Sequence, residues 1–259
     1  MKTEIELNRI YERNELIWGK EIQQYLFTRH IIVAGIGGVG SYAAEALARS
    51  CVGNITLIDF DTVSSSNINR QLPALLSNIG EQKTELMKKR IELINPHIKV
   101  NIISEFYTKK LNKELFGSSN HMPDLVIDAI DTLKSKIDLI ESCYSNNIEI
   151  ISSFGAGNRI KPEELYIADI IDIKSGNCPF ITNIKHKLKQ RGIIKGITAV
   201  ASHEKPIKCE KIISEIELIS DNGEKSMIKK FSPGSTPFVP PVAGYIMASW
   251  AVRRLLETK

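Results

Sequence analysis

The most informative stretch of this sequence is a glycine cluster between an apolar run and a helical pattern. Residues 31–40 read IIVAGIGGVG, and SYAAEALARS follows directly. A strand, a glycine turn and a helix place backbone N–H groups at a helix N-terminus, where the helix dipole favours a phosphate. Gly35 would permit the tight turn, Gly37 and Gly38 the close approach of a ligand, and Gly40 the packing of helix on strand. An ordinary turn before a helix would show the same letters, so other residues must decide.

Short β-branched runs alternate with amphipathic helical patterns in the first part of the chain. The runs are residues 31–35, 55–59, 99–103, 124–128 and 148–152. This alternation predicts an α/β fold of the Rossmann-like, doubly wound type, in which helices cover both faces of a mainly parallel sheet. Such sheets bind ligands at the carboxyl ends of their strands, near the switch point.

We expect three regions within one compact domain of 259 residues. Residues 1–30 are charged and predict an N-terminal helical arm, with a helix around residues 21–28, although a solvated arm is the alternative. Residues 31–155 form the nucleotide-binding core. Residues 156–259 add a C-terminal extension of strands and helices for substrate binding and dimerisation, with an alternating strand over 165–173, a basic helix over 183–192, a strand over 197–201 and a terminal helix.

Composition narrows the class of protein and its compartment. The net charge of +4 permits contact with nucleic acid but does not show it. Cys51, Cys143, Cys178 and Cys209 are far apart and include no CxxC pair, so neither a zinc ribbon nor a disulfide framework is indicated. We expect reduced thiols in a cytoplasmic protein without structural zinc. No signal peptide is apparent, and no apolar run approaches the roughly 18 residues of a membrane span, so we expect no membrane association.

A polar loop follows the second predicted strand. Asp59 ends that strand about 20 residues past the glycine turn, where a carboxylate can bond ribose hydroxyls. Farther on, Arg70 offers a planar fork of donors to phosphate, and Lys83 supplies a compact point charge. A hydride-transfer site has no need for a triphosphate clamp, whereas nucleotidyl transfer does. The residues predicted to contact the nucleotide here are Asp59, Asp61, Ser66, Asn67, Arg70, Gln71 and Lys83.

The fourth predicted strand ends in DLVIDAIDT, residues 124–132. Asp128 could simply cap the strand, but Asp131, followed by Thr132, lies past the strand end, where the sheet faces the ligand. A carboxylate beside a phosphate is repulsive unless a divalent cation lies between them, so Asp131 implies Mg²⁺. For each charged residue taken alone, a solvated loop position is the alternative.

Four motifs occur in order along the chain: GIGGVGS at 35–41, DFDTVSSSNINRQ at 59–71, GEQK at 80–83 and DAIDT at 128–132. Together they resemble the ubiquitin-activating-enzyme-like adenylyltransferase superfamily, which includes the activators of molybdopterin and thiamine sulfur carriers. The resemblance covers about residues 13–155 and implies attack of a carboxylate on the α-phosphate of Mg-ATP, giving an acyl-adenylate and pyrophosphate. It assigns the ribose to Asp59, the phosphates to Asn67, Arg70, Gln71 and Lys83, and the magnesium to Asp131.

Further motifs resemble one branch of this superfamily, the tRNA threonylcarbamoyladenosine dehydratases. They are RNELIWG at 13–19, VASHEKP at 200–206 and GSTPFVPPVAG at 234–244, although His203 departs from the residue usual in that branch. The resemblance implies a tRNA substrate whose threonylcarbamoyladenosine at position 37 is adenylated on its carboxylate and then cyclised with loss of AMP. Ring closure by the neighbouring carbamoyl group is intramolecular and so entropically favoured.

Alternatives to this function stay open. The sulfur-carrier activators usually hold a structural zinc in two CxxC pairs, which this chain lacks. Cys178 lies roughly where other branches have a thioester-forming cysteine, but a packing role is the alternative. A non-catalytic nucleotide-binding module or an NAD-dependent oxidoreductase would leave the cations and Asp131 unused. The sequence leaves open a requirement for a monovalent cation and for sulfur-transfer partner proteins.

Two basic features suggest partners. Arg13 resembles the superfamily's arginine finger, which reaches the γ-phosphate in the neighbouring subunit and therefore implies a homodimer with composite sites. The basic helix is the candidate for contact with the tRNA backbone, with a solvated helix face as the alternative. Its residues are Lys185, His186, Lys187, Lys189 and Arg191, with Lys195 just beyond.

Overall fold

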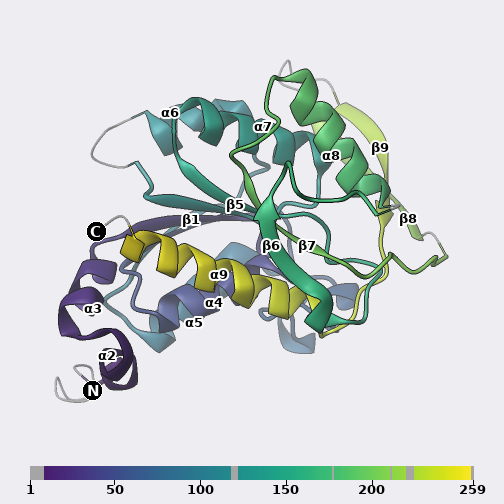
Figure 1. Ribbon diagram of the computed structural model, residues 1–259. Coiled ribbons are helices and arrows are strands. Elements are labelled where there is room, and N and C mark those ends of the chain that lie inside the picture. The colour runs from purple at the N-terminus through teal and green to yellow at the C-terminus, as the bar shows by residue number, and fades with distance from the viewer. Residues whose placement is uncertain (1–8, 118–121, 177, 211, 220–224, 258–259) are drawn as a thin grey trace.

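A seven-stranded sheet runs through the centre of the molecule with helices on both faces (Figure 1). The strand order is β3-β2-β1-β4-β5-β7-β6, and β6 alone among these strands is antiparallel to its neighbour. The order reverses between β1 and β4, which is the switch point of a doubly wound sheet. The predicted α/β fold is therefore confirmed. The strands are β1 (His30–Ala34), β2 (Asn54–Ile58), β3 (Lys99–Ile103), β4 (Leu125–Asp128), β5 (Glu149–Ser153), β6 (Leu165–Asp169) and β7 (Thr198–Ser202).

The computed structural model describes residues 9–117, 122–176, 178–210, 212–219 and 225–257, with 212–219 and 225–232 described by their backbone alone. Residues 1–8 of the predicted arm lie outside the described residues. The rest of the arm is two helices, α2 (Glu12–Trp18) and α3 (Lys20–Phe27), of which only the second was predicted. Gly19 joins them at φ 84°, a left-handed conformation that glycine adopts without steric cost.

Two hydrophobic layers enclose the sheet. The layer of α4 (Gly40–Arg49), α5 (Lys83–Ile94) and α9 (Val239–Glu257) covers one face. The layer of α6 (Asn112–Phe116), α7 (Leu133–Ser145) and α8 (Pro179–Gln190) covers the other, as Figure 1 shows. Short 3₁₀ helices lie in the connections: η1 (Ser65–Asn67), η2 (Leu76–Asn78), η3 (Lys109–Leu111) and η4 (Pro162–Glu164).

Most predicted strands agree with the structure to within about one residue, but the strand predicted over 165–173 ends early. The Asp169 side chain accepts a hydrogen bond from the Ile171 N–H at 3.0 Å, and the Asp172 N–H bonds the Asp169 carbonyl at 3.0 Å. This local turn competes with the ladder and ends β6 at Asp169. The basic helix begins earlier than predicted, because Pro179 starts α8 at a position that suits proline.

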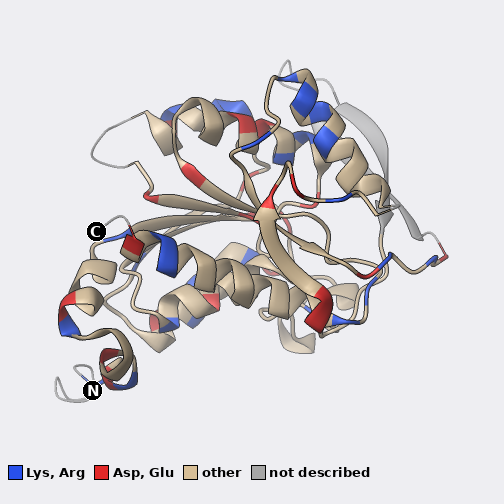
Figure 2. Cartoon of the chain, in the orientation of Figure 1, with Lys and Arg blue, Asp and Glu red and all other residues tan. Residues whose placement is uncertain are grey.

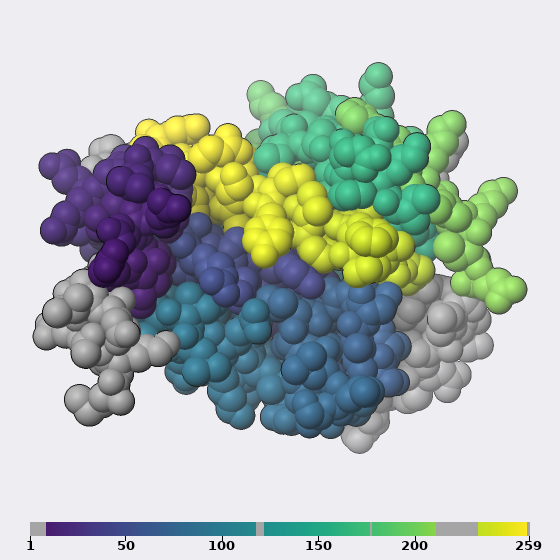
Figure 3. All heavy atoms as spheres, turned by 90° about the horizontal axis from the view of Figure 1, so that it is seen from below, coloured from purple at the N-terminus to yellow at the C-terminus, as the bar shows by residue number. Residues whose placement is uncertain are grey.

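The C-terminal region contains a hairpin that was not predicted, followed by the terminal helix. Strands β8 (Ile212–Ile219) and β9 (Lys225–Ser232) pair antiparallel, apart from the main sheet. Seen from below, α9 lies across the surface between the N-terminal arm and the green segment that contains β6 and α8 (Figure 3). In the described part of the chain, no helix combines the length and apolarity that crossing a bilayer requires.

Candidate active site

The glycine turn joins β1 to α4 at the switch point, and its geometry requires glycine at two positions. Gly35 has φ 88°, and a Cβ there would lie 2.7 Å from the carbonyl oxygen of Ala129. A Cβ on Gly40 would lie 1.7 Å from the Gly35 carbonyl oxygen. Within the described chain, the amides of Gly37 and Gly38 have no backbone partner. They stand at the N-terminus of α4, where an anion is favoured.

Asp59 is bound to this turn. Its carboxylate accepts hydrogen bonds from the Ile36 N–H at 2.5 Å and from the Asp61 N–H at 2.8 Å. Burial raises the pKa of Asp59, although the charge of Lys83 and the two amides act in the opposite direction. The predicted ribose acid is therefore held by the backbone at the edge of the glycine turn.

Arg70 lies on the other side of the glycine turn. Its Cγ would be 3.3 Å from a Cβ on Gly38, and its Nη1 donates to the Ser66 carbonyl at 2.8 Å and to Asn69 Oδ1 at 2.9 Å. Burial lowers the pKa of Arg70, and the charge of Asp131 raises it. The stem of Arg70 therefore packs against the glycine turn, and its partly desolvated guanidinium, held by Ser66 and Asn69, has donors that suit a phosphate.

Asn67 and Gln71 are buried under the same loop. Asn67 Oδ1 accepts the Ser64 N–H at 3.1 Å within a capping box that shapes η1. Gln71 is 8% exposed, and its Oε1 has no hydrogen-bond partner among the described residues. Its Nε2 would lie 3.7 Å from a Cβ on Gly37. A buried acceptor without a partner is costly, so this site fits a ligand or ligand-bound water that donates to it.

Lys83 begins α5 and is paired with Asp61. Its Nζ lies 2.9 Å from Asp61 Oδ2, with the lysine side chain 4% exposed and the aspartate 40% exposed. A bridge between Thr62 and Gln82 brings the two segments together. Because the pair is neutral overall, the positive potential for a phosphate comes first from Arg70 and the turn amides.

Asp131 and Thr132 follow β4, across the switch point from the glycine turn. Asp131 is exposed, and its Oδ1 accepts the Thr132 hydroxyl at 3.3 Å. The described residues contain no group of three or more acidic, histidine or cysteine side chains suited to a metal ion. A divalent cation at Asp131 would thus take most of its ligands from phosphate and water, as Mg²⁺ does in nucleotide sites.

The sequence analysis missed a buried cluster behind this loop. Asp128, Lys136 and Ser152 are fully enclosed, with Lys136 Nζ 2.6 Å from Asp128 Oδ2. Asp128 is therefore more than a strand cap. A signal was present in the sequence, because position 136 falls on the apolar stripe of α7 formed by Leu133, Ile137 and Ile140.

The structure does not bring Arg13 to the site within its own chain. Arg13 is exposed on α2, whose neighbouring residues Tyr11 and Asn14 bond the carbonyls of Ala48 and Arg49 at 2.8 and 2.7 Å. Those carbonyls end α4, whereas the glycine turn begins it. A helix of 10 residues separates the two ends by about 15 Å.

Basic residues, blue in Figure 2, occur along α8. Together with the basic residues just after this helix, they divide into two groups by their contacts. Lys185 Nζ donates to the Ile173 carbonyl at 2.5 Å, and Arg191 pairs with Asp138 and Glu141 of α7 at 2.8 and 2.6 Å. His186 bonds Gln190 at 3.0 Å. By contrast, Lys187, Lys189 and Lys195 are exposed and have no ion pair with a described residue.

Cys178 is buried at the N-terminus of α8, 5% exposed. Cys51 and Cys143 are also buried, and burial raises the pKa of Cys51 to about 12. Cys209 is exposed.

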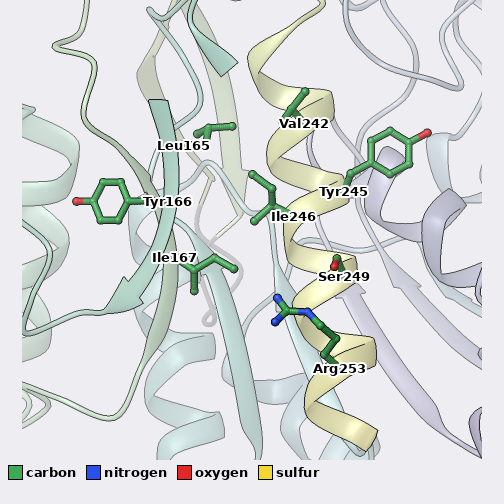
Figure 4. A pocket seen from close by; sticks show the side chains of 8 residues that line it. All are labelled: Leu165, Tyr166, Ile167, Val242, Tyr245, Ile246, Ser249 and Arg253. Carbon is green, nitrogen blue, oxygen red and sulfur yellow. The ribbon is translucent and has the colours of Figure 1, made fainter. Parts of the chain in front are cut away.

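A groove with a volume of about 510 Å³ lies between β6 and α9, and no residue of the glycine turn lines it (Figure 4). Leu165 and Ile167 point toward α9 and Ile246 points back toward β6, while Tyr166 points away. Arg253 is the charged side chain of the lining. This apolar surface does not suit a triphosphate.

Comparison with known proteins identifies the family of the chain. The ThiF family pattern matches residues 11–259. A Bacillus subtilis protein named tRNA threonylcarbamoyladenosine dehydratase is 43% identical over 248 residues, which make up 95% of this chain and 94% of that protein. Crystal structures of the E. coli tRNA N6-threonylcarbamoyladenosine dehydratase with AMP and with ATP have TM-scores of 0.82 and 0.81, at 31% and 30% identity. Each likeness covers 100% of this chain and 98% of the other.

Proposed function

The chain belongs to the ThiF family, and from this we propose that it is an ATP-dependent dehydratase acting on threonylcarbamoyladenosine at position 37 of tRNA. The observation that carries the proposal is the glycine turn at the switch point, where the amides of Gly37 and Gly38 have no backbone partner among the described residues and the side chain of Arg70 lies beside Gly38. This arrangement suits a nucleoside triphosphate. The choice of tRNA as the substrate is based on the names of the relatives that match over nearly the whole chain.

Each residue has a task in adenylation. Asp59 holds the ribose hydroxyls, and the amides of Gly37 and Gly38 bind phosphate oxygens. Arg70 stabilises the charge that builds up on the α-phosphate when the substrate carboxylate attacks it. Lys83 leaves Asp61 and turns to the departing pyrophosphate. Asn67, Gln71, Ser66 and Thr132 complete the polar wall of the site.

Asp131 would hold the magnesium ion. Bound Mg²⁺ would neutralise phosphate charge and orient the leaving pyrophosphate. The charge of Asp131 acts on Arg70, so this carboxylate lies near the guanidinium that would meet the phosphates.

Adenylation prepares the second step. The carbamoyl group of the same side chain attacks the substrate carbonyl carbon and loses a proton. The bond between that carbon and the phosphate-linked oxygen breaks, so AMP leaves and a ring forms. Because the nucleophile is intramolecular, no enzyme thiol is needed. The buried position of Cys178 agrees with a packing role.

We infer a cytoplasmic homodimer with shared sites. Arg13 is exposed far from its own glycine turn, and its neighbours Leu16 and Ile17 are 75% and 82% exposed. Beside the nucleotide loop, Leu75 and Leu76 are 58% and 80% exposed. Contact of these apolar side chains between two copies would bury them and carry Arg13 toward the partner's phosphates.

The decisive experiment is pyrophosphate release from ATP with tRNA that carries threonylcarbamoyladenosine. We expect stimulation by this tRNA, a cyclised product, and no stimulation by the same tRNA without the threonylcarbamoyl group. Stimulation by a small sulfur-carrier protein, with none by tRNA, would establish the alternative function, activation of a carrier C-terminus. A catalytically inactive Arg70→Ala protein that folds normally is the control for contaminating ATPases.

A further inference from the structure

A fully enclosed ion pair lies directly behind the turn that carries Asp131. Lys136 of α7 and Asp128 of β4 both have side chains that are 0% exposed, and Lys136 Nζ is 2.6 Å from Asp128 Oδ2. Ser152 of β5 donates its hydroxyl to the same oxygen at 2.6 Å and lies 3.1 Å from Lys136 Nζ. Removing such a pair from water costs several kcal/mol per ion, and apolar replacements are often as stable. Stability alone therefore does not account for a lysine here.

The pair has a clear mechanical consequence for the turn. Asp128 uses its second oxygen, Oδ1, to accept the Ile130 N–H at 3.1 Å, and the Ala129 N–H bonds the Ala34 carbonyl at 2.8 Å. Both carboxylate oxygens of Asp128 are thus in use, one toward the turn and one toward Lys136. A movement of Lys136 would release the residue that shapes the turn.

The same turn packs against the glycine turn on its other side. A Cβ on Gly35 would meet the Ala129 carbonyl oxygen at 2.7 Å and the Ile130 nitrogen at 3.0 Å. The segment between Asp128 and Asp131 is therefore held between the nucleotide turn in front and Lys136 behind. The charge of Lys136 also acts on Asp131, which is the exposed end of this segment.

We propose that Lys136 is a positioning residue for the reaction: through Asp128 and Ser152 it fixes the turn 129–131 so that Asp131 meets the metal-nucleotide. This inference rests on the proposed use of Mg-ATP. Groups that orient a metal ligand commonly change metal affinity by about 10–100-fold when they are removed. A purely structural pair would change stability without changing the response to magnesium.

The test measures ATP binding to the full-length protein without tRNA, at a series of Mg²⁺ concentrations. Because Lys136→Met alone leaves Asp128 buried and unpaired, the main variant is Lys136→Met with Asp128→Asn. A second variant, Ser152→Ala, removes one hydroxyl and is expected to fold. The control is Ile140→Val, one turn further along the buried side of α7, which alters packing only.

We expect the double variant to need about tenfold more Mg²⁺ for half-maximal ATP binding, and Ser152→Ala to need a smaller excess. Ile140→Val should lower the melting temperature and keep the wild-type Mg²⁺ response. Wild-type Mg²⁺ dependence in both test variants would overturn the inference. If the double variant does not fold, the Mg²⁺ dependence of Ser152→Ala alone decides. If the wild-type protein itself does not bind Mg-ATP, the proposed function fails instead.

Discussion

At the scale of single residues, a comparison of two glycines with positive φ distinguishes two reasons for requiring glycine: backbone conformation and contact with neighbouring atoms. Gly35 and Gly80 have φ 88° and 92°, so both conformations disfavour a side chain. A Cβ on Gly80 would meet no atom within 4 Å, whereas on Gly35 it would meet the Ala129 carbonyl at 2.7 Å. Only Gly35 is required by both its conformation and its neighbours.

Substitution of each glycine by alanine tests this distinction. Gly80→Ala should lower the free energy of unfolding by about 1–2 kcal/mol, the cost of the left-handed conformation. Gly35→Ala should lower it by more than about 3 kcal/mol, because the turn and the segment after β4 must move apart. Denaturant unfolding gives both values, and ATP titration should show loss of binding in Gly35→Ala only. Equal effects would refute the close approach.

At the scale of elements, α4 and α5 are joined by a buried carboxylate. Glu45 of α4 accepts Arg90 Nε at 2.8 Å and Arg49 Nε at 2.8 Å, and its side chain is 5% exposed. The helices begin at Gly40 and Lys83, two of the residues proposed to contact the nucleotide. Glu45 therefore links the two helices that begin at the proposed site.

The Glu45→Gln variant should reveal this contact through pH. Burial would raise the pKa of Glu45, but hydrogen bonds from Arg90 and Arg49 leave it below the ordinary value of 4.5. Its contribution is therefore present above the unfolded pKa and is lost as the pH falls through the folded pKa. We expect Glu45→Gln to lower the free energy of unfolding by about 1–3 kcal/mol at pH 7.

Unfolding of the two proteins between neutral and acidic pH provides the measurement. The difference between wild type and Glu45→Gln should shrink as the pH falls below 4.5, the ordinary pKa. Glu92→Gln, at an exposed position of α5, should follow the wild-type curve throughout. Parallel curves for wild type and Glu45→Gln would mean that ionisation of the Glu45 carboxylate does not contribute to the pH dependence of stability.

At the scale of the whole molecule, the arm places Arg13 at the far end of α4 from the glycine turn, so its proposed role needs two chains. Arg13→Ala and Arg70→Ala should each lose adenylation. When the two variants are mixed and their subunits exchange, each heterodimer has one intact site. With random pairing, about half of the dimers are heterodimers, so about a quarter of wild-type activity should return. Exchange can be checked by differential tagging. Heterodimers without activity would show that Arg13 does not act across an interface.

The second prediction at this scale concerns the tRNA surface. Lys187 and Lys189 are exposed and lack ion pairs with described residues, whereas Arg191 is bound to α7. Lys187→Glu with Lys189→Glu should weaken tRNA binding and reduce the salt dependence by about one phosphate contact per lysine. Lys89→Glu with Lys99→Glu, on the opposite layer and sheet edge, is the charge-matched control. Equal affinity and salt slope in both double variants would exclude α8 from the interface.

The amino-acid sequence was enough to predict the fold class, because the alternation of apolar strands and amphipathic helices is a local pattern that a parallel sheet with two covered faces can bury. It also determined the order of the motifs that show the family, since each motif is continuous in the chain. The positions proposed for the nucleotide follow from those motifs.

Tertiary structure decided which of those residues have partners, because pairing depends on distance across the fold. In the folded chain Asp61 pairs with Lys83, and Arg191 pairs with two acidic residues of α7. Arg13 lies near the C-terminal end of α4, whereas the glycine turn of its own chain lies at the N-terminal end. The tertiary structure also buried Lys136 against Asp128, eight positions apart in sequence. A lysine on an apolar helix stripe gives no sign of its partner until the strand before that helix is in place.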